Sequence, residues 1–337
     1  MSDITNVAFV GGGFWARYHM GLILQQPQTT RIVAICEPDE AVYKQAASEF
    51  AAFGVLPPPH VLDLDTLLNG SGERIDAVFI VTPHARHHDQ VKRCLEAGLD
   101  VIVEKPMVMT AQEAASLIET RDRTGRLLVV AFQGSLSPQI REAVRMIQTG
   151  RLGQVLNVSG VVWQDWKRHA GSWRTVPELS GGGFLFDTGA HMLNTVADLV
   201  GEDFTDVAAW FDNRGLEVEV LGAVIARTRS GILVTINACG DTIPSCASDI
   251  RVFGTQGILR TGQWGEILEF QPAGRKRLQK VKVDPSLGVW EQFLKIRAGE
   301  IANASPPEIG LRMARLWDAV RASAGQGGAR VNIETSH

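Results

Sequence analysis

An alternation of short apolar blocks with helical stretches, running up to residue 133, limits the fold more than any other feature. The blocks are continuous rather than alternating in polarity, which is typical of strands buried on both faces of a parallel sheet. Helices between such strands predict a doubly wound α/β domain. The expected strands are 7–10, 32–35, 77–81, 101–103 and 127–132, and the expected helices are 17–25, 41–53, 89–97 and 111–123. Three consecutive prolines at 57–59 predict a short or irregular third strand, because proline has no N–H to donate to a sheet.

The pattern changes after residue 134, where several apolar runs alternate with polar residues. Such alternation favours an antiparallel sheet with one solvent-exposed face. The expected strands are 155–162, 207–211, 218–228, 232–238, 249–253 and 257–260, and the expected helices are 189–200 and 308–322. Because 337 residues are many for one core, we predict two domains. Residues 1–133 form the α/β domain, and 134–337 form an α+β domain with a large open, mainly antiparallel sheet, whose final helix packs near the domain junction.

Charge and composition exclude several classes of partner. A net charge of −4 leaves no basic surface for nucleic acid or an anionic membrane. No apolar run approaches the length of a membrane span, and no secretory signal precedes the first strand. Four cysteines without motif spacing favour free thiols, so we expect a cytoplasmic protein. The open sheet predicts self-association, as a homodimer or homotetramer.

The first expected strand runs directly into Gly-x-Gly-x-x-Ala and then a helix. Gly11 permits the tight turn, Gly13 lets the backbone approach a pyrophosphate, and Ala16 keeps the helix close to the strand. The free N–H groups of the helix N-terminus would face the phosphates, with Phe14 and Trp15 beside them. These features predict a dinucleotide-binding Rossmann domain, although a glycine triplet can also mark a purely structural turn.

The second expected strand ends in Glu37, and no basic residue follows it at once. A carboxylate at this position can bind both ribose hydroxyls of NAD and repels a 2′-phosphate. We therefore expect NAD rather than NADP.

Polar residues follow two later strands, at the sheet edge where ligands bind in a doubly wound fold. Thr82, Pro83 and His87 follow one strand, and Glu104 and Lys105 follow the next. All five are candidates for contact with the cofactor. A lysine beside a positively charged nicotinamide is a usable acid–base group, although a surface lysine before a proline turn would look the same.

A second group of chemical side chains lies in the segment Gly181-Gly182-Gly183-Phe184-Leu185-Phe186-Asp187-Thr188-Gly189-Ala190-His191. Asp187 and His191 are four residues apart at the start of an expected helix, so they should share a face. Together with Lys105 they form a candidate proton relay. Two alternatives remain open, a helix-capping aspartate with a core histidine, or a pair of metal ligands. Because no third ligand lies nearby, we predict no metal.

Aromatic and cationic residues crowd one stretch of the second domain. Trp163, Trp173 and Arg174 suit a sugar or cyclic polyol, since ring C–H groups stack on indole and hydroxyls accept from guanidinium. Lys105, Asp187 and His191 complete the expected substrate contacts. Tryptophans that pack a sheet or a subunit interface are the alternative reading.

These motifs, in this order, resemble the glucose–fructose oxidoreductase / inositol dehydrogenase (Gfo/Idh/MocA) family. The resemblance spans nearly the whole chain and rests on Gly11–Gly13 with His19, Glu37-Pro38, Thr82-Pro83…His87, Glu104-Lys105-Pro106, Trp173-Arg174 and Gly181–Gly183…Asp187…His191. It implies NAD(P) as cofactor, frequent dimers or tetramers, and Lys105, Asp187 and His191 as the catalytic lysine, aspartate and histidine. The expected activity is a dehydrogenase that acts on a sugar, polyol or related cyclic alcohol.

Two other functions remain open on the sequence. Some members of the family use bound NAD transiently, as in redox-assisted glycoside cleavage. The other is a nucleotide-sensing protein without turnover, although a sensor has no need of a proton relay. The residues also leave open whether Lys105 or His191 is the primary acid–base group, because coupled groups titrate together.

Overall fold

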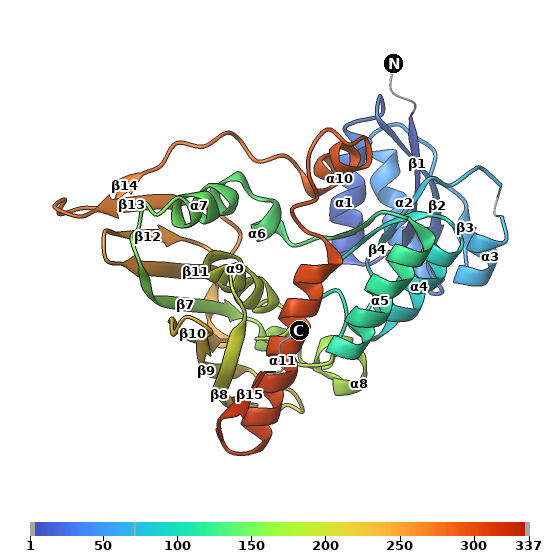
Figure 1. Ribbon diagram of the computed structural model, residues 1–337. Helices are drawn as coiled ribbons and strands as arrows, with labels where there is room; N and C mark the ends of the chain where they lie inside the picture. Colours follow the sequence, from blue (N-terminus) through green and yellow to red (C-terminus); the bar gives the residue numbers. More distant parts are fainter. Residues whose placement is uncertain (1–3, 71, 334–337) are drawn as a thin grey trace. The chain divides into compact units, whose positions relative to one another are not determined.

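The computed structural model describes residues 4–70 and 72–333 and divides into two compact units (Figure 1). The first unit extends to Met107 and also contains Glu113–Ala131 and Gly288–Pro307. The second contains Val108–Gln112, Phe132–Leu287 and the chain from Glu308 on. Each unit therefore takes in segments that are far apart in the sequence.

The first unit is built on a six-stranded sheet in the order β3-β2-β1-β4-β5-β6, and all its paired strands are parallel. This confirms the predicted doubly wound sheet. Its central strands are buried from end to end because both faces are covered by helices. The strands are β1 (Thr5–Val10), β2 (Thr30–Cys36), β3 (His60–Val61), β4 (Ala77–Ile80), β5 (Asp100–Val103) and β6 (Leu128–Val130).

Four helices of this unit agree with the expected positions, and a short fifth, at Leu64–Leu68, was not predicted. They are α1 (Phe14–Leu24), α2 (Glu40–Ala51), α3 (Leu64–Leu68), α4 (His87–Glu96) and α5 (Ala111–Thr124), with a short 3₁₀ turn at His84–Arg86. The strand after the prolines, β3, has two residues, as predicted from their missing N–H groups. Chain order reverses at β1, so the carboxyl ends of β1 and β4 flank the point where such folds bind ligands.

A segment from near the end of the chain completes the first unit. Helix α10 (Val289–Arg297), drawn in orange-red in Figure 1, belongs to this unit, and its Trp290 stacks on Phe79 of β4 at 6.2 Å between ring centroids. The indole N–H of Trp290 donates to Thr30 Oγ1 at 2.8 Å. Further on, Ser305 O accepts the N–H of Val130, on the edge strand β6, at 2.9 Å.

The second unit is built on a nine-stranded sheet in the order β14-β13-β12-β11-β7-β10-β9-β8-β15. All its neighbouring strands are antiparallel except the parallel pair β7 and β10. The predicted, mainly antiparallel sheet is thus confirmed. A tight turn at 228–231 connects β9 to β10. The strands are β7 (Val155–Asp165), β8 (Phe204–Asp212), β9 (Leu221–Thr228), β10 (Leu233–Cys239), β11 (Asp241–Gly254), β12 (Gly257–Thr261), β13 (Leu268–Pro272), β14 (Gln279–Lys280) and β15 (Val331–Asn332).

One face of this sheet is covered and the other is open. Helix α9 packs on the covered face, where Met192 lies against Gly160 of β7. Side chains of β7 therefore alternate, so that Val162 is buried while Val161 is 38% exposed. The helices are α6 (Gln133–Leu136), α7 (Pro138–Gln148), α8 (Pro177–Ser180), α9 (Ala190–Val200) and α11 (Pro307–Gly325), with 3₁₀ turns at Lys167–His169 and Trp173–Thr175. None of the helices in the described ranges is long and apolar enough to cross a membrane.

Candidate active site

The turn between β1 and α1 has the geometry that a pyrophosphate requires. Gly11 has a φ of +98°, and a Cβ there would lie 2.3 Å from the Val81 carbonyl oxygen, so only glycine fits. Gly13 precedes α1 without a side-chain cap, and a Cβ there would meet nothing within 4 Å. The first N–H groups of α1 therefore have no side-chain cap and can donate to an anion. Phe14 and Trp15, on the same turn of helix, are 67% and 42% exposed.

Glu37 follows β2 and is fixed to the glycine turn. One oxygen, Oε2, accepts the N–H of Gly12 at 2.8 Å, and the other, Oε1, accepts the N–H of Asp39 at 3.1 Å. The carboxylate keeps further lone pairs for ribose hydroxyls. These residues fit a dinucleotide with an unphosphorylated ribose.

A hydrogen bond between His19 and Glu104 supports the loop that carries Lys105. Glu104 Oε1 lies 2.8 Å from His19 Nε2, and Glu104 Oε2 accepts the backbone N–H of Lys105 at 3.1 Å. Burial raises the pKa of Glu104, but the hydrogen bond and charge of His19, with the charge of Lys105, outweigh burial and leave this pKa below its ordinary value. Glu104 is therefore a carboxylate that fixes the backbone of the half-buried Lys105.

His87 joins the two loops at this edge of the sheet. Its ring nitrogens lie 2.9 Å from the Pro106 and Thr82 carbonyl oxygens, and burial lowers its pKa. Thr82 Oγ1 in turn donates to Gln90 Oε1 at 2.6 Å. Through these two contacts the fully buried His87 fixes the backbone at Thr82 and Pro106, which would meet a cofactor.

In the second unit, Asp187 is held by two donors. Its Oδ2 accepts the indole N–H of Trp166 at 2.9 Å and the Nε–H of Arg174 at 3.0 Å. Asp187 lies in the turn before α9, whose cap residue is Gly189. The capping alternative for Asp187 is therefore wrong.

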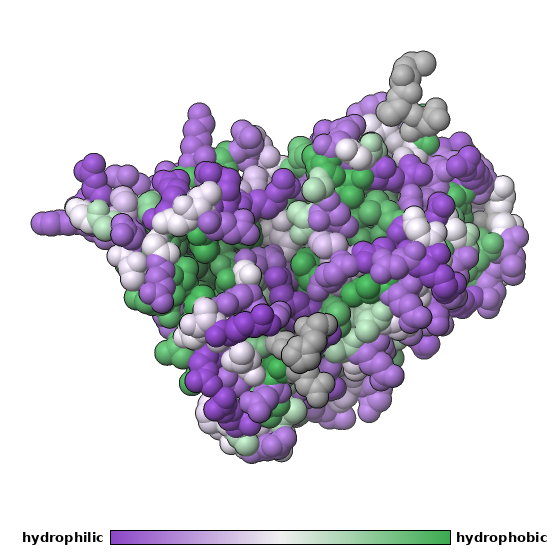
Figure 2. All heavy atoms as spheres, viewed as in Figure 1, coloured by the Kyte–Doolittle hydropathy of each residue, from purple (hydrophilic) through white to green (hydrophobic). Residues whose placement is uncertain are grey.

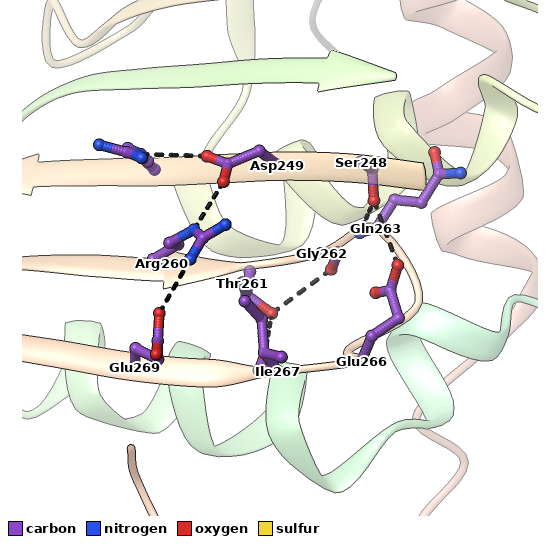
Figure 3. Close-up of polar contacts among 10 residues, drawn as sticks. Ser248, Asp249, Arg260, Thr261, Gly262, Gln263, Glu266, Ile267 and Glu269 are labelled. Atoms are coloured by element: carbon purple, nitrogen blue, oxygen red, sulfur yellow. Dashed lines mark hydrogen bonds and ion pairs between the residues drawn. The ribbon is translucent and has the colours of Figure 1, made fainter. Parts of the chain in front are cut away.

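His191 lies in the first turn of α9 and is 6% exposed. Its ring makes edge-to-face contacts with Phe132 at 6.1 Å and Trp264 at 5.7 Å between centroids. Trp264 stands on the tight turn between β12 and β13, shown in Figure 3, where Gln263 N–H donates to Ser248 Oγ at 2.9 Å. Neither aromatic contact was expected, because both partners are far from His191 in sequence.

The structure separates the aromatic residues expected to contact a substrate. The guanidinium of Arg174 lies 4.6 Å over the Trp173 ring, so both are close to Asp187. By the alternation along β7, Trp163 lies on the same face as Val161, which α9 does not cover. Trp163 therefore lies on the side of the sheet away from α9. Trp166, rather than Trp163, contacts Asp187 through its indole N–H. Among residues 4–70 and 72–333, no group of three His, Cys, Asp or Glu is arranged to hold a metal.

Comparison with models of known protein families identifies the family of this chain. A family model described as "Oxidoreductase family, NAD-binding Rossmann fold" matches residues 5–132, and the "GFO/IDH/MocA C-terminal domain" matches residues 140–260. The chain belongs to the Gfo/Idh/MocA family. Membership confirms the predicted family, and the first unit matches the model that is described as an NAD-binding Rossmann fold.

Curated Gfo/Idh/MocA relatives act on sugars and polyols. Levoglucosan dehydrogenase of Pseudarthrobacter phenanthrenivorans is 26% identical over 65% of this chain and 58% of its own length. Inositol 2-dehydrogenase 2 of Saccharopolyspora erythraea is 26% identical over 68% of this chain and 65% of its own length. The chain thus spans less than two thirds of these relatives.

Solved Gfo/Idh/MocA structures share the whole fold. A levoglucosan dehydrogenase in complex with NADH and levoglucosan superposes with a TM-score of 0.83 at 21% identity, over 99% of this chain and 100% of the other. The WlbA dehydrogenase from Bordetella pertussis, in complex with NADH and UDP-GlcNAcA, gives 0.82 at 23% identity, over 99% and 100%. At these identities the likeness establishes the architecture.

Proposed function

We propose that this protein is an NAD-dependent dehydrogenase that oxidises a CH–OH group of a sugar, polyol or related cyclic alcohol. The observation that carries the proposal is the fixed carboxylate of Asp187, which lies just before His191 in a chain whose other unit binds NAD. A protein that only senses a nucleotide would not need a carboxylate held by both Trp166 and Arg174. The sugar and polyol substrates of the curated relatives support the substrate class.

In this reaction the protein moves a proton while the nicotinamide, when bound, accepts a hydride. The Lys105 Nζ or the His191 imidazole takes the hydroxyl proton of the substrate. Asp187 orients these groups and balances their charge, with Arg174 and Trp166 keeping its carboxylate in place. Glu104 keeps the Lys105 backbone in position through its bond to that N–H. Trp173, under Arg174, offers an aromatic face to a sugar ring.

NADH formation from NAD across a panel of inositols, aldoses, anhydrosugars and sugar acids tests this function. A signal that disappears in Lys105→Met would support the dehydrogenase and begin to identify the alcohol. Product formation without net NADH would instead favour transient use of NAD in glycoside cleavage. Tight NADH binding with no product from any alcohol or glycoside would favour a sensor.

We propose that Glu37 selects NAD over NADP, and a single substitution tests this role. Glu37→Gln keeps an oxygen that can accept the Gly12 N–H but removes the charge that repels a 2′-phosphate. The ratio of the NADPH to the NADH dissociation constant should fall by about tenfold, since one such contact contributes roughly 1–3 kcal/mol. Calorimetric titration with both nucleotides measures it. Glu40→Gln, which changes an exposed carboxylate on α2, is the control and should leave the ratio unchanged.

We propose that the open sheet of the second unit is the contact between subunits of a homodimer or homotetramer. Ile225 and Leu233 are 50% and 51% exposed, and with Val161 they are apolar side chains on the open face of β9, β10 and β7. On the neighbouring strands, Asp249 pairs with Arg251. Arg260 pairs with both Asp249 and Glu269 (Figure 3). Hydrophilic residues cover the part of the molecule where β13 and β14 lie (Figure 2). Exposed apolar side chains beside charged strands suit a specific interface.

Ile225→Arg should therefore convert the oligomer to a smaller species. The introduced charge would lie unpaired in the centre of the contact, which costs several kcal/mol of association free energy. Light scattering coupled to size exclusion measures the mass. Leu56→Arg changes an equally apolar side chain that is 88% exposed in the first unit, and it should leave the mass unchanged. An Ile225→Arg protein of wild-type mass would contradict the proposed interface.

A further inference from the structure

A buried glutamate lies beneath the turn that leads to Asp187. Glu219 belongs to the short apolar stretch before β9 and is 4% exposed. Its Oε2 accepts the N–H of Gly183 at 2.6 Å, and its Oε1 accepts the N–H of Phe186 at 3.2 Å. Its own carbonyl oxygen accepts the N–H of Phe184 at 2.8 Å. One residue therefore satisfies three N–H groups of the same turn.

These three N–H groups belong to one helical turn. The N–H of Asp187 donates to Gly183 O at 2.8 Å, which closes the turn at Asp187. The N–H groups at the start of a helical turn have no partner within it, and a carboxylate is among their preferred acceptors. In most helices this acceptor is the residue just before the helix. Here the acceptor is the carboxylate of Glu219, which lies 33 residues beyond Phe186 along the chain.

The turn is also pressed against the Glu219 backbone. A Cβ at Gly183 would lie 1.9 Å from the Glu219 carbonyl oxygen, so the two backbones are in direct contact. On the other side, Asp187 is held by Trp166 and Arg174. The turn is thus fixed at both ends.

The charge of Glu219 does not serve stability. Burial raises the pKa of Glu219 to about 7, and the N–H groups of Gly183 and Phe186 oppose this rise only in part. A carboxyl group whose pKa is raised by folding contributes less stability as the pH increases from its unfolded value to its folded one. The ionised Glu219 therefore contributes less to stability than its protonated form does.

We infer that Glu219 is the positioning residue of this site: its carboxylate fixes the turn 183–187 and thereby sets the orientation of Asp187. This inference rests on the proposed function, in which Asp187 acts at the substrate. A positioning residue differs from a structural one in its effect: removal of the Glu219 carboxylate should reduce catalysis without a matching loss of stability.

Glu219→Gln tests the inference with three measurements. Amide hydrogen exchange in 183–187 should become at least tenfold faster, because an amide offers one oxygen and places an NH₂ group against a backbone N–H. On the best substrate of the panel, kcat should fall about 10- to 100-fold, while the KM for NAD stays within twofold. The midpoint of thermal unfolding at pH 8 should stay close to that of the wild type, because the loss of the buried charge offsets the lost hydrogen bond. Glu202→Gln is the matched control, since Glu202 accepts from the Ser230 N–H in the β9–β10 turn.

The possible outcomes separate this inference from the proposed function. Unchanged exchange in 183–187 would overturn the positioning role, and so would a kcat loss that is matched by a lower unfolding midpoint. Asp187→Asn, measured on the same substrate, tests the function itself. If Asp187→Asn is inactive while Glu219→Gln turns over like the wild type, the inference fails and the function stands. If Asp187→Asn is fully active, the proposed relay fails, whereas the exchange measurement still reports on Glu219.

Discussion

Lys105→Met is expected to lower turnover by about 10³-fold while NADH binding stays within a few-fold. Methionine has a similar length and keeps the apolar stem of the side chain, so the loop after β5 should retain its packing. The substitution removes the Nζ atom that would carry the proton, and positioned acid–base groups contribute a factor of about 10² to 10⁴ in rate. The Lys105 backbone N–H still donates to Glu104, so the support beneath the loop remains. Steady-state NADH formation and a fluorescence titration with NADH measure the two effects.

Lys44→Met is the matched control for this experiment. Lys44 is an exposed lysine of α2 in the same unit, where it pairs with Glu40. Exposed ion pairs of this kind contribute little to stability, so its loss should leave turnover and binding unchanged. A fully active Lys105→Met protein would rule out the lysine as proton carrier and leave His191 as the remaining candidate. A variant that also loses NADH binding would show that Lys105 acts mainly through the cofactor.

Gly183→Ala is expected to cause the largest loss of stability in the second unit. Its Cβ would lie 1.9 Å from the Glu219 carbonyl oxygen and 2.8 Å from the carbonyl carbon, so the backbone would have to move. Forcing extra volume into a packed site costs about 1–3 kcal/mol, and backbone neighbours cannot rotate away as side chains can. About 3 kcal/mol corresponds to a fall of roughly 6–12 °C in the midpoint of thermal unfolding for a unit of this size. Calorimetry or circular dichroism measures this fall.

Gly325→Ala provides the comparison, because a Cβ at Gly325 would meet nothing within 4 Å at the end of α11. Alanine favours a helix over glycine, so this control should be neutral or slightly stabilising. NADH binding, which belongs to the first unit, should survive in both proteins. An unchanged unfolding midpoint for Gly183→Ala would mean that the turn 183–187 is not packed against Glu219 as described.

Local pattern and turn chemistry were enough to predict most of the architecture. The strands of the first unit are apolar blocks buried on both faces, and the prolines before β3 limited that strand to two residues. Helix α7 was not predicted, although a signal for it exists. Ser137 accepts the N–H of Ile140 with its side chain, and Pro138 occupies the first turn. Strand β14 was missed because a two-residue polar strand at a sheet edge has no apolar pattern, whereas β13, which was also missed, carries a short alternation in which Leu268 and Phe270 are buried.

The site was predictable where its residues follow one another in sequence and not where the fold brings them together. The glycine turn, Glu37 and the Glu104–Lys105 pair follow strands that could be recognised, so their place in the fold was clear in advance. Trp264 contacts His191 from another part of the chain, which no local pattern reveals. Glu219 left one faint sign, a lone carboxylate within an apolar run that was expected to be a strand.

Residues 288–307 belong to the first unit although they follow most of the second in sequence. This limits the order in which the protein can fold during synthesis. Ser305, whose carbonyl oxygen accepts from the edge strand β6, is made 174 residues after Ala131. At about 5–20 residues per second, the ribosome needs roughly 10–35 seconds to cover that distance. During this interval the nascent nucleotide-binding sheet lacks the cover that Trp290 provides at Phe79, and part of β6 is unpaired. Although it is made first, this unit can reach its final form only after the second unit has been almost completely translated.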